Sequence, residues 1–105
     1  MARRERDIQA DTLIALQEAW PFGLFYRRNV GAFKAGNRFV KFGVAGQADI
    51  AGCVEGRMVE IEVKAAGKKQ RLEQKHWQEA IERCGGIYIL ASSPEQAIEE
   101  LRRKL

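Results

Sequence analysis

The residues of this chain best suited to chemistry are Asp49, Glu62 and Lys64. Two carboxylates beside an amine are the groups that bind a hard divalent cation and stabilise negative charge next to it. They can act together only if the fold brings them to one place. The residues between them therefore decide whether the three form a site.

A β-hairpin is predicted to bring these three residues together. Residues 49–54 and 57–64 have the composition of two strands, and only a Glu-Gly pair separates them. A two-residue turn fixes every cross-strand pair, and counting back from it sets Asp49 directly opposite Glu62. Directly opposed residues hold their Cβ atoms about 4.5–5.5 Å apart, and a residue two positions along shares their face. Lys64 is therefore expected beside the acidic pair.

Two opposed carboxylates repel each other, and nothing else in the hairpin relieves this repulsion. A bound divalent cation such as Mg²⁺ would relieve it, because hard cations prefer carboxylate oxygens. Lys64 could then face a developing negative charge or hold the attacking water. These are the parts needed for metal-assisted hydrolysis of a phosphodiester. The alternative interpretation is a surface hairpin with ordinary solvated charges.

The opposite face of the predicted hairpin is apolar. It carries Ala48, Ile50, Val54, Val59, Ile61 and Val63, with Gly52 between them. This face is expected to pack on the core, while the acidic face lines a cleft. A shift of one residue in the register would bury the charges instead, so the pattern favours a single register.

Length and composition predict one domain, residues 1–105, with one core. The formal net charge of +4 is compatible with an anionic partner. No apolar run approaches the roughly 20 residues of a membrane span, and no signal-peptide core is present, so we expect a cytoplasmic protein without a membrane partner. Cys53 and Cys84 predict two free thiols, and a single histidine, His76, gives poor support for a zinc site or a Ser-His-Asp triad.

The rest of the chain predicts an α/β fold with a mixed central β-sheet flanked by helices, in the order α-β-β-β-β-α-β-α. Helices are expected at 4–20, 70–84 and from 94 to the C-terminus, strands at 24–30, 38–42 and 87–91 beside the hairpin, and a loop at 31–37. The expected buried positions of the first two helices are Ile8, Leu13, Ile14 and Leu16, then Leu72, Trp77, Ala80 and Ile81. The segment from the Glu62 strand through helix 70–84 to strand 87–91 should form a right-handed βαβ unit.

Two further polar residues are candidates for the cleft. Gln74 lies in the first turns of the 70–84 helix, where it could hydrogen-bond the attacking water or a ligand carboxylate, or simply be solvated. Glu5 lies in the first turn of the first helix and interacts favourably with the helix dipole there. It could add a carboxylate to the cation, but sequence spacing does not place it.

Basic residues gather on both sides of the hairpin. Arg27, Arg28, Lys34, Arg38 and Lys41 precede it, and Lys68, Lys69, Arg71 and Lys75 follow it. Phosphate backbones attract such groups without regard to base sequence, so these residues are candidate DNA-binding residues. The alternative is a set of solvated charges. Phe33 and Phe39 lie among them and could stack on bases or pack in the core.

Short motifs along nearly the whole chain follow one family pattern. They fall at residues 5–9, 28–32, 42–43, 46–52, 60–64, 74, 85–86 and 92–97. On these motifs the chain resembles the VRR-NUC domain of the PD-(D/E)XK nuclease superfamily, and its small size resembles the stand-alone form found in phages. Ala48 stands where the superfamily's name has a proline, which costs little because the chemistry requires the neighbouring carboxylate.

The resemblance implies a restriction-endonuclease-like core and a Mg²⁺- or Mn²⁺-dependent DNA endonuclease. Asp49 and Glu62 would bind the metal together with the backbone carbonyl of Val63, and Glu5 is a further candidate ligand. Lys64 would orient or activate water, and Gln74 would support the site. The resemblance also implies a homodimer that cuts branched DNA such as four-way (Holliday) junctions, in the host cytoplasm if phage-encoded.

The main alternative is a non-catalytic DNA-binding module that recruits partners. Such a module would bind DNA in a salt-sensitive way without metal-dependent cutting. The complete set of Asp49, Glu62 and Lys64 argues against it, because binding alone needs no acidic pair beside phosphates.

Overall fold

The computed structural model describes residues 4–28 and 31–105, with the backbone alone for 31–33 and 40–42, and contains three helices and six strands over these residues. They are α1 (Glu5–Ala19), β1 (Leu24–Arg27), β2 (Gly31–Ala35), β3 (Arg38–Phe42), β4 (Ile50–Val54), β5 (Arg57–Val63), α2 (Leu72–Arg83), β6 (Ile87–Ala91) and α3 (Pro94–Lys104). Among the residues described, no helix combines the length and the apolar composition needed to cross a membrane.

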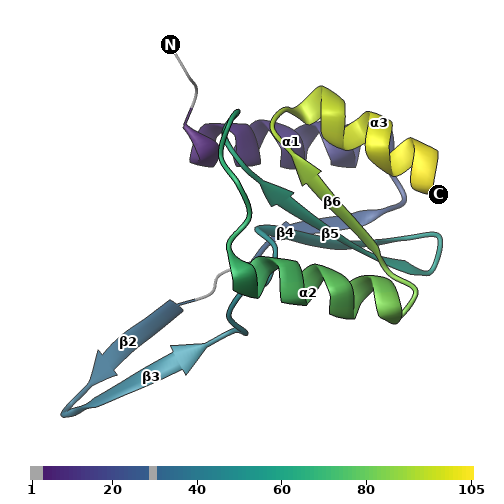
Figure 1. The fold of residues 1–105 in the computed structure, drawn as a ribbon. Helices are drawn as coiled ribbons and strands as arrows, with labels where there is room; N and C mark the ends of the chain where they lie inside the picture. Colours follow the sequence, from purple (N-terminus) through teal and green to yellow (C-terminus); the bar gives the residue numbers. More distant parts are fainter. Residues whose placement is uncertain (1–3, 29–30) are drawn as a thin grey trace.

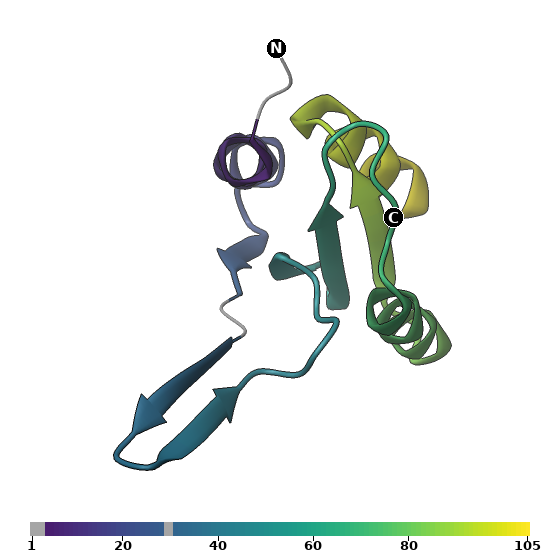
Figure 2. The same cartoon turned by 60° about the vertical axis from the view of Figure 1, so that its left-hand side comes forward.

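A mixed four-stranded sheet forms the centre of the molecule (Figure 1). Its strand order is β1-β4-β5-β6, with β1, β4 and β5 antiparallel and β5 parallel to β6. Helices α1 and α3 cover one face and α2 lies on the other (Figures 1 and 2). The predicted mixed sheet flanked by helices is confirmed. So is the parallel pairing of two strands joined through α2.

The prediction of a loop at 31–37 is wrong, because residues Gly31–Ala35 pair with Arg38–Phe42 as an antiparallel ribbon. Gly36 adopts a φ of 63° and, with the next residue, makes a two-residue turn that small residues favour. Five strands therefore precede α2 in place of four. The ribbon β2–β3 is a separate sheet that projects from the body of the molecule (Figure 2). The predicted strand 24–30 ends earlier, at Arg27, and residues 29 and 30 lie outside those described.

The main core lies between the sheet and helices α1 and α3. The predicted apolar face of the hairpin supplies much of it, through Ile50, Val54, Val59, Ile61 and Val63. On α1, Ile8 and Leu16 are buried as expected, with Thr12 between them. These positions recur every fourth residue along one helix face. Ile14 lies off that face and is exposed, so its predicted burial is wrong.

A smaller cluster lies on the other side of the sheet, beneath α2. It contains Ala48, Ile81 and Tyr88, with Trp77 packed against it. Ala48 was expected on the main core face, and this is wrong because β4 begins only at Ile50, so strand alternation does not extend to residue 48. Leu72 was expected in the buried stripe of α2 but is exposed.

Local signals set the helix ends. Gly85 has a φ of 88°, and the N–H groups of Gly85 and Gly86 donate to the carbonyls of Glu82 and Ile81, which ends α2 as a glycine stop predicts. Ser93 caps α3 and accepts the N–H of Gln96, as expected. Cys53 and Cys84 are free thiols, which confirms that prediction.

The turn of the β4–β5 hairpin has the geometry that fixes its register. Val54 pairs with Arg57, as predicted, around Glu55 and Gly56. These two residues have φ values of 52° and 80°, and positive φ at both central positions defines a type I′ turn. The twist of this turn matches that of the strands, so the pairing continues without a bulge to Ile50.

We expect Gly56→Ala to lower the free energy of unfolding by about 1–2 kcal/mol, because a Cβ at positive φ approaches the following carbonyl oxygen. No neighbouring atom lies within 4 Å of that Cβ, so the loss would come from the backbone conformation. Glu55→Asn in the same turn is the matched control and should keep or raise stability, since Asn tolerates positive φ better. Urea unfolding measures the free energy of unfolding of both variants. A value for Gly56→Ala equal to that of the wild type would contradict the role of this turn.

Candidate functional site

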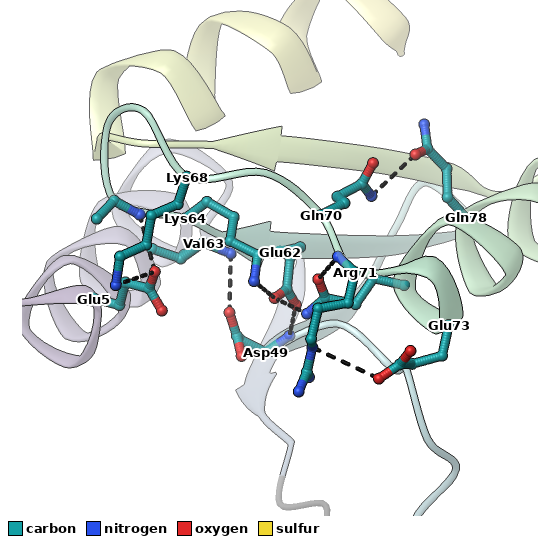
Figure 3. Close-up of polar contacts among 12 residues, drawn as sticks. Glu5, Asp49, Glu62, Val63, Lys64, Lys68, Gln70, Arg71, Glu73 and Gln78 are labelled. Carbon is teal, nitrogen blue, oxygen red and sulfur yellow. Dashed lines mark hydrogen bonds and ion pairs between the residues drawn. The ribbon is translucent and has the colours of Figure 1, made fainter.

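The β4–β5 hairpin brings the carboxylates of Asp49 and Glu62 together. The strand pairing runs in the predicted register up to Ile50 and Ile61, the pair next to the two acids. The Asp49 N–H donates to Glu62 Oε1 at 3.2 Å, and the Val63 N–H donates to Asp49 Oδ2 at 2.9 Å (Figure 3). Glu62 is only 3% exposed. The predicted juxtaposition of the two acids across the hairpin is confirmed.

Lys64 and Gln74 both approach Glu62. The Lys64 Nζ lies 4.0 Å from Glu62 Oε2, so the amine shares the acidic face as predicted (Figure 3). The Gln74 Nε2 donates to the same oxygen at 2.7 Å, and Gln74 is buried. Its Oε1 accepts the N–H of Arg71 at 2.8 Å, which caps the start of α2. One amide therefore both begins the helix and holds the carboxylate.

The loop before β4 closes one side of the site. A Cβ on Gly46 would lie 2.2 Å from the carbonyl oxygen of Glu73. Only glycine at position 46 therefore lets the loop approach the first turn of α2 this closely. Gly46 also has a φ of 87°, which a side chain rarely adopts. This contact fixes the position of the loop against the helix that carries Gln74.

These elements enclose a cavity of about 460 Å³ with a mostly charged lining. It is lined by Glu5, Arg28, Gly46, Gln47, Ala48, Asp49, Glu62, Lys64, Lys68, Arg71 and Gln74. Residues from α1, the two loops, the hairpin and α2 therefore meet at one end of the sheet. The acidic pair lies among four basic side chains, an arrangement suited to a cation and a polyanion together.

Glu5 reaches this cavity but is held by other groups. Its Oε1 accepts the N–H of Ala65 at 3.1 Å and lies 3.8 Å from Lys68 Nζ (Figure 3). Across residues 4–28 and 31–105, no three acidic, histidine or cysteine side chains form a group that could hold a metal ion. Glu5 therefore does not join the two hairpin acids as a third carboxylate in this conformation.

The backbone carbonyl of Val63 points to the side of β5 on which Asp49 lies. The Lys64 N–H donates to the Ala91 carbonyl on β6. In a trans peptide the carbonyl points opposite to the N–H, so the Val63 carbonyl points away from β6, toward the Asp49 side. The Val63 N–H bond to Asp49 agrees with this direction. The Val63 carbonyl therefore points to the same side of β5 as Asp49.

Burial raises the pKa of Glu62 from 4.5 to about 8, and the charge of Asp49 adds to the shift, while Lys64 opposes it. Burial likewise raises the pKa of Asp49, although the Val63 N–H opposes that shift. The pair therefore retains a proton near neutral pH unless a cation replaces it. Each carboxylate can accept about four hydrogen bonds or metal contacts, so lone pairs remain for such a cation. These hard oxygen donors fit Mg²⁺ or Mn²⁺.

The predicted DNA-binding residues lie in different parts of the structure, some in the cavity and some outside it. Arg28 and Lys68 line the cavity. Arg27 and Lys69 are exposed outside its lining, and Lys34 and Arg38 are exposed on the β2–β3 ribbon. The side chains of Lys41 and Phe33 lie outside the described part of the structure, and Phe39 on the same ribbon is exposed.

Sequence reasoning missed the part played by Glu60. This residue is fully buried and its Oε1 accepts Arg28 Nη1 at 2.6 Å and Trp77 Nε1 at 2.8 Å. Burial disfavours the charge on Arg28, but Glu60 and, to a smaller extent, Tyr26 oppose this, and the pKa of the guanidinium is raised. Strand alternation could have indicated it, because Glu60 shares the face of Glu62 and a carboxylate beneath a helix needs hydrogen-bond donors.

Comparison of the chain with protein-family models, with curated proteins and with solved structures finds no match. The function must therefore follow from the groups of the site itself. The convergent oxygens are suited to a hard divalent cation, and the surrounding guanidinium and ammonium groups are suited to phosphates.

The raised pKa of Glu62 predicts that the metal-free protein loses stability as the pH rises. The folded protein keeps a proton that the unfolded chain releases above about 4.5, so this contribution is full below that pH and is lost as the pH passes about 8. Glu62→Gln removes the titrating group and should flatten the fall in unfolding free energy over this range. Urea unfolding in EDTA at several pH values measures the effect.

Glu73→Gln, at an exposed glutamate near Arg71, is the matched control and should follow the wild type. A wild-type free energy of unfolding that stays flat or rises between about pH 5 and pH 8 would contradict the predicted protonation of the pair.

Proposed function

We propose that this protein is a Mg²⁺- or Mn²⁺-dependent endodeoxyribonuclease that hydrolyses DNA phosphodiester bonds. One observation carries the proposal: buried Glu62 and half-buried Asp49 lie beside Lys64 in a cavity lined with basic groups. The resemblance of the sequence to VRR-NUC domains supports the same function. On this proposal, the mixed sheet and its helices are a restriction-endonuclease-like core.

Asp49, Glu62 and the Val63 carbonyl would hold the cation. When bound, it would polarise a phosphoryl oxygen and lower the pKa of a water ligand. The protein's own hydrogen bonds prepare the two acids for this role. The Val63 N–H orients Asp49, and Gln74 orients Glu62. Both carboxylates are thus fixed before a ligand arrives, which avoids reorganisation during the reaction.

Lys64 supplies a fixed positive charge at the same place. Its Nζ lies 4.0 Å from Glu62, and its side chain is mostly buried. An ammonium in a partly dry site stabilises the charge that builds up on a phosphoryl oxygen more strongly than one in water. It can also hold the attacking water through one of its three N–H donors.

The positive charges around the cavity suit a DNA substrate, which is a polyanion. Arg28, Lys68 and Arg71 line it, and such groups bind phosphate backbones without regard to sequence. A second hollow of about 560 Å³ lies between α1 and the start of α3, and the described residues that line it include Asp11, Glu18 and Glu95 but no basic side chain. A polyanion would be repelled there, so the Asp49 cavity is the better site.

Branched DNA and a homodimer complete the proposal. A four-way junction presents two equivalent strands, and a two-fold dimer would present two equivalent sites to them. The resemblance to stand-alone VRR-NUC domains supports this substrate, and such an enzyme would act in the cytoplasm. A non-catalytic DNA-binding module is the competing function.

We expect the wild type to cut labelled four-way junctions, flaps or linear duplexes when Mg²⁺ or Mn²⁺ is present. Asp49→Asn and Lys64→Ala should each reduce the single-turnover rate by at least about a hundredfold, because each removes charge from the site. Glu99→Gln, at an exposed position on α3, is the control for loss of an acid and should cut normally. Equal rates in the wild type and Asp49→Asn would defeat the site assignment. Salt-sensitive binding without any cutting would favour the binding module.

Metal binding can be measured apart from cleavage. Titration calorimetry should show Mn²⁺ binding that is tighter at about pH 8 than at about pH 6, because binding displaces the proton held through the raised pKa of Glu62. Asp49→Asn should abolish the binding. Affinity that is independent of pH, or unchanged in that variant, would contradict the proposed ligands.

A further inference from the structure

Arg28 differs from Lys68 and Arg71, two other basic residues of the cavity, in how it is held. Its backbone N–H donates to the Asp49 carbonyl at 2.8 Å, and its guanidinium lies 2.6 Å from Glu60. The Arg28 side chain is 14% exposed, whereas the side chains of Lys68 and Arg71 are each 67% exposed. Arg28 is therefore fixed in the wall of the cavity, while Lys68 and Arg71 are largely solvated.

Glu60, which pairs with Arg28, connects strand β5 to helix α2. Glu60 lies on β5, and its Oε1 also accepts the indole N–H of Trp77 from α2. Glu62 and Gln74 make the neighbouring contact between the same strand and helix. These two parallel contacts connect the guanidinium of Arg28 to the elements that carry the acidic pair.

Stability alone gives a poor account of this arrangement. Burying an ion pair costs desolvation, and apolar residues of similar volume often give equal or greater stability. Here the pair is also incompletely satisfied, because Glu60 Oε2 is buried with no hydrogen-bond partner among the described residues. What an apolar pair could not provide is a fixed guanidinium in the cavity wall.

A guanidinium carries five N–H donors in a planar fork that matches the oxygens of a phosphate. Glu60 accepts from Nη1, and Tyr26 also interacts with the group. Donors of the fork remain for a ligand that enters the cavity. Arg28, Asp49 and Glu62 line the same cavity, so such a ligand would lie near the acidic pair.

We propose that Arg28 binds a phosphodiester in the cavity directly, and that Glu60, fixed by Trp77, is a positioning residue that holds the guanidinium in its binding orientation. The identity of the ligand rests on the proposed function. The binding step itself requires no metal and no cleavage. It is therefore open to a separate test.

The indole N–H of Trp77 is a built-in reporter, because it shares Glu60 Oε1 with Arg28. We would titrate ¹⁵N-labelled protein in EDTA with a thymidine dinucleotide that carries a single phosphodiester. The chain has two tryptophans, and Trp20 packs against the main core with Arg102 over its ring, so its indole signal is an internal control. The Trp77 signal should move with the ligand while that of Trp20 stays in place.

Arg28→Lys keeps the charge but loses the fork, and should weaken dinucleotide binding by about tenfold or more. Arg57→Lys is the matched control, since Arg57 lies at the opposite end of β5 and donates to the carbonyls of Gly85 and Lys104. Its affinity should equal that of the wild type. Glu60→Gln keeps Arg28 but loosens its position, and should also weaken binding.

A purely structural role makes a different prediction. Replacing Arg28 and Glu60 together by Gln removes both buried charges, so the double variant should recover the thermal stability that the single variants lose but should not recover binding. Dinucleotide affinity that equals the wild type in Arg28→Lys or the double variant would overturn the binding role of Arg28. Unchanged affinity in Glu60→Gln would overturn the positioning role of Glu60. A Trp77 signal that does not move in the wild type would overturn the whole proposal.

Binding of a phosphodiester by Arg28 and cleavage of DNA can each fail without the other. A wild type that binds the dinucleotide through Arg28 but cuts no DNA with either metal would refute the nuclease and support the phosphodiester site. A wild type that cuts DNA while Arg28→Lys keeps full dinucleotide affinity would support the nuclease and refute the role of Arg28.

Discussion

The repulsion between the carboxylates of Asp49 and Glu62 is the constraint on which the rest of the site depends. The type I′ turn fixes the hairpin register, and the register forces the two acids together. Hydrogen bonds from Val63 and Gln74 orient the acids, but burial, together with the charge of Asp49, still raises the pKa of Glu62 to about 8. Near neutral pH the pair therefore retains a proton, which any cation that binds there must displace.

Helix α2 links the packing of the protein to this site. Gln74 caps the helix and binds Glu62, and Trp77 packs beneath the helix and binds Glu60. The alternation of β5 makes this possible, because Val59, Ile61 and Val63 lie in the main core while Glu60 and Glu62 bind side chains of α2. A shift of α2 would therefore disturb the smaller apolar cluster beneath it and, at the same time, the hydrogen bonds to Glu60 and Glu62.

Short-range rules predicted the parts of the structure that depend on neighbouring residues. A two-residue turn and strand alternation were enough for the hairpin register and for its apolar face, and Ser93 and Gly85 set helix ends as expected. The same rules failed where a boundary moved. Ala48 lies just before β4 begins, so its side chain does not follow the alternation. Strand β2 formed within residues 31–37, where small residues had suggested a loop.

The sequence by itself determined that Asp49, Glu62 and Lys64 would share one face, because a tight turn leaves no freedom in the pairing. Only the tertiary structure decided what surrounds them. Glu60 meets Arg28 and Trp77 from positions 32 and 17 residues away, and these contacts depend on the strand order and on where α2 packs. Such long-range contacts follow from the packing of whole elements, which no spacing within a single segment specifies.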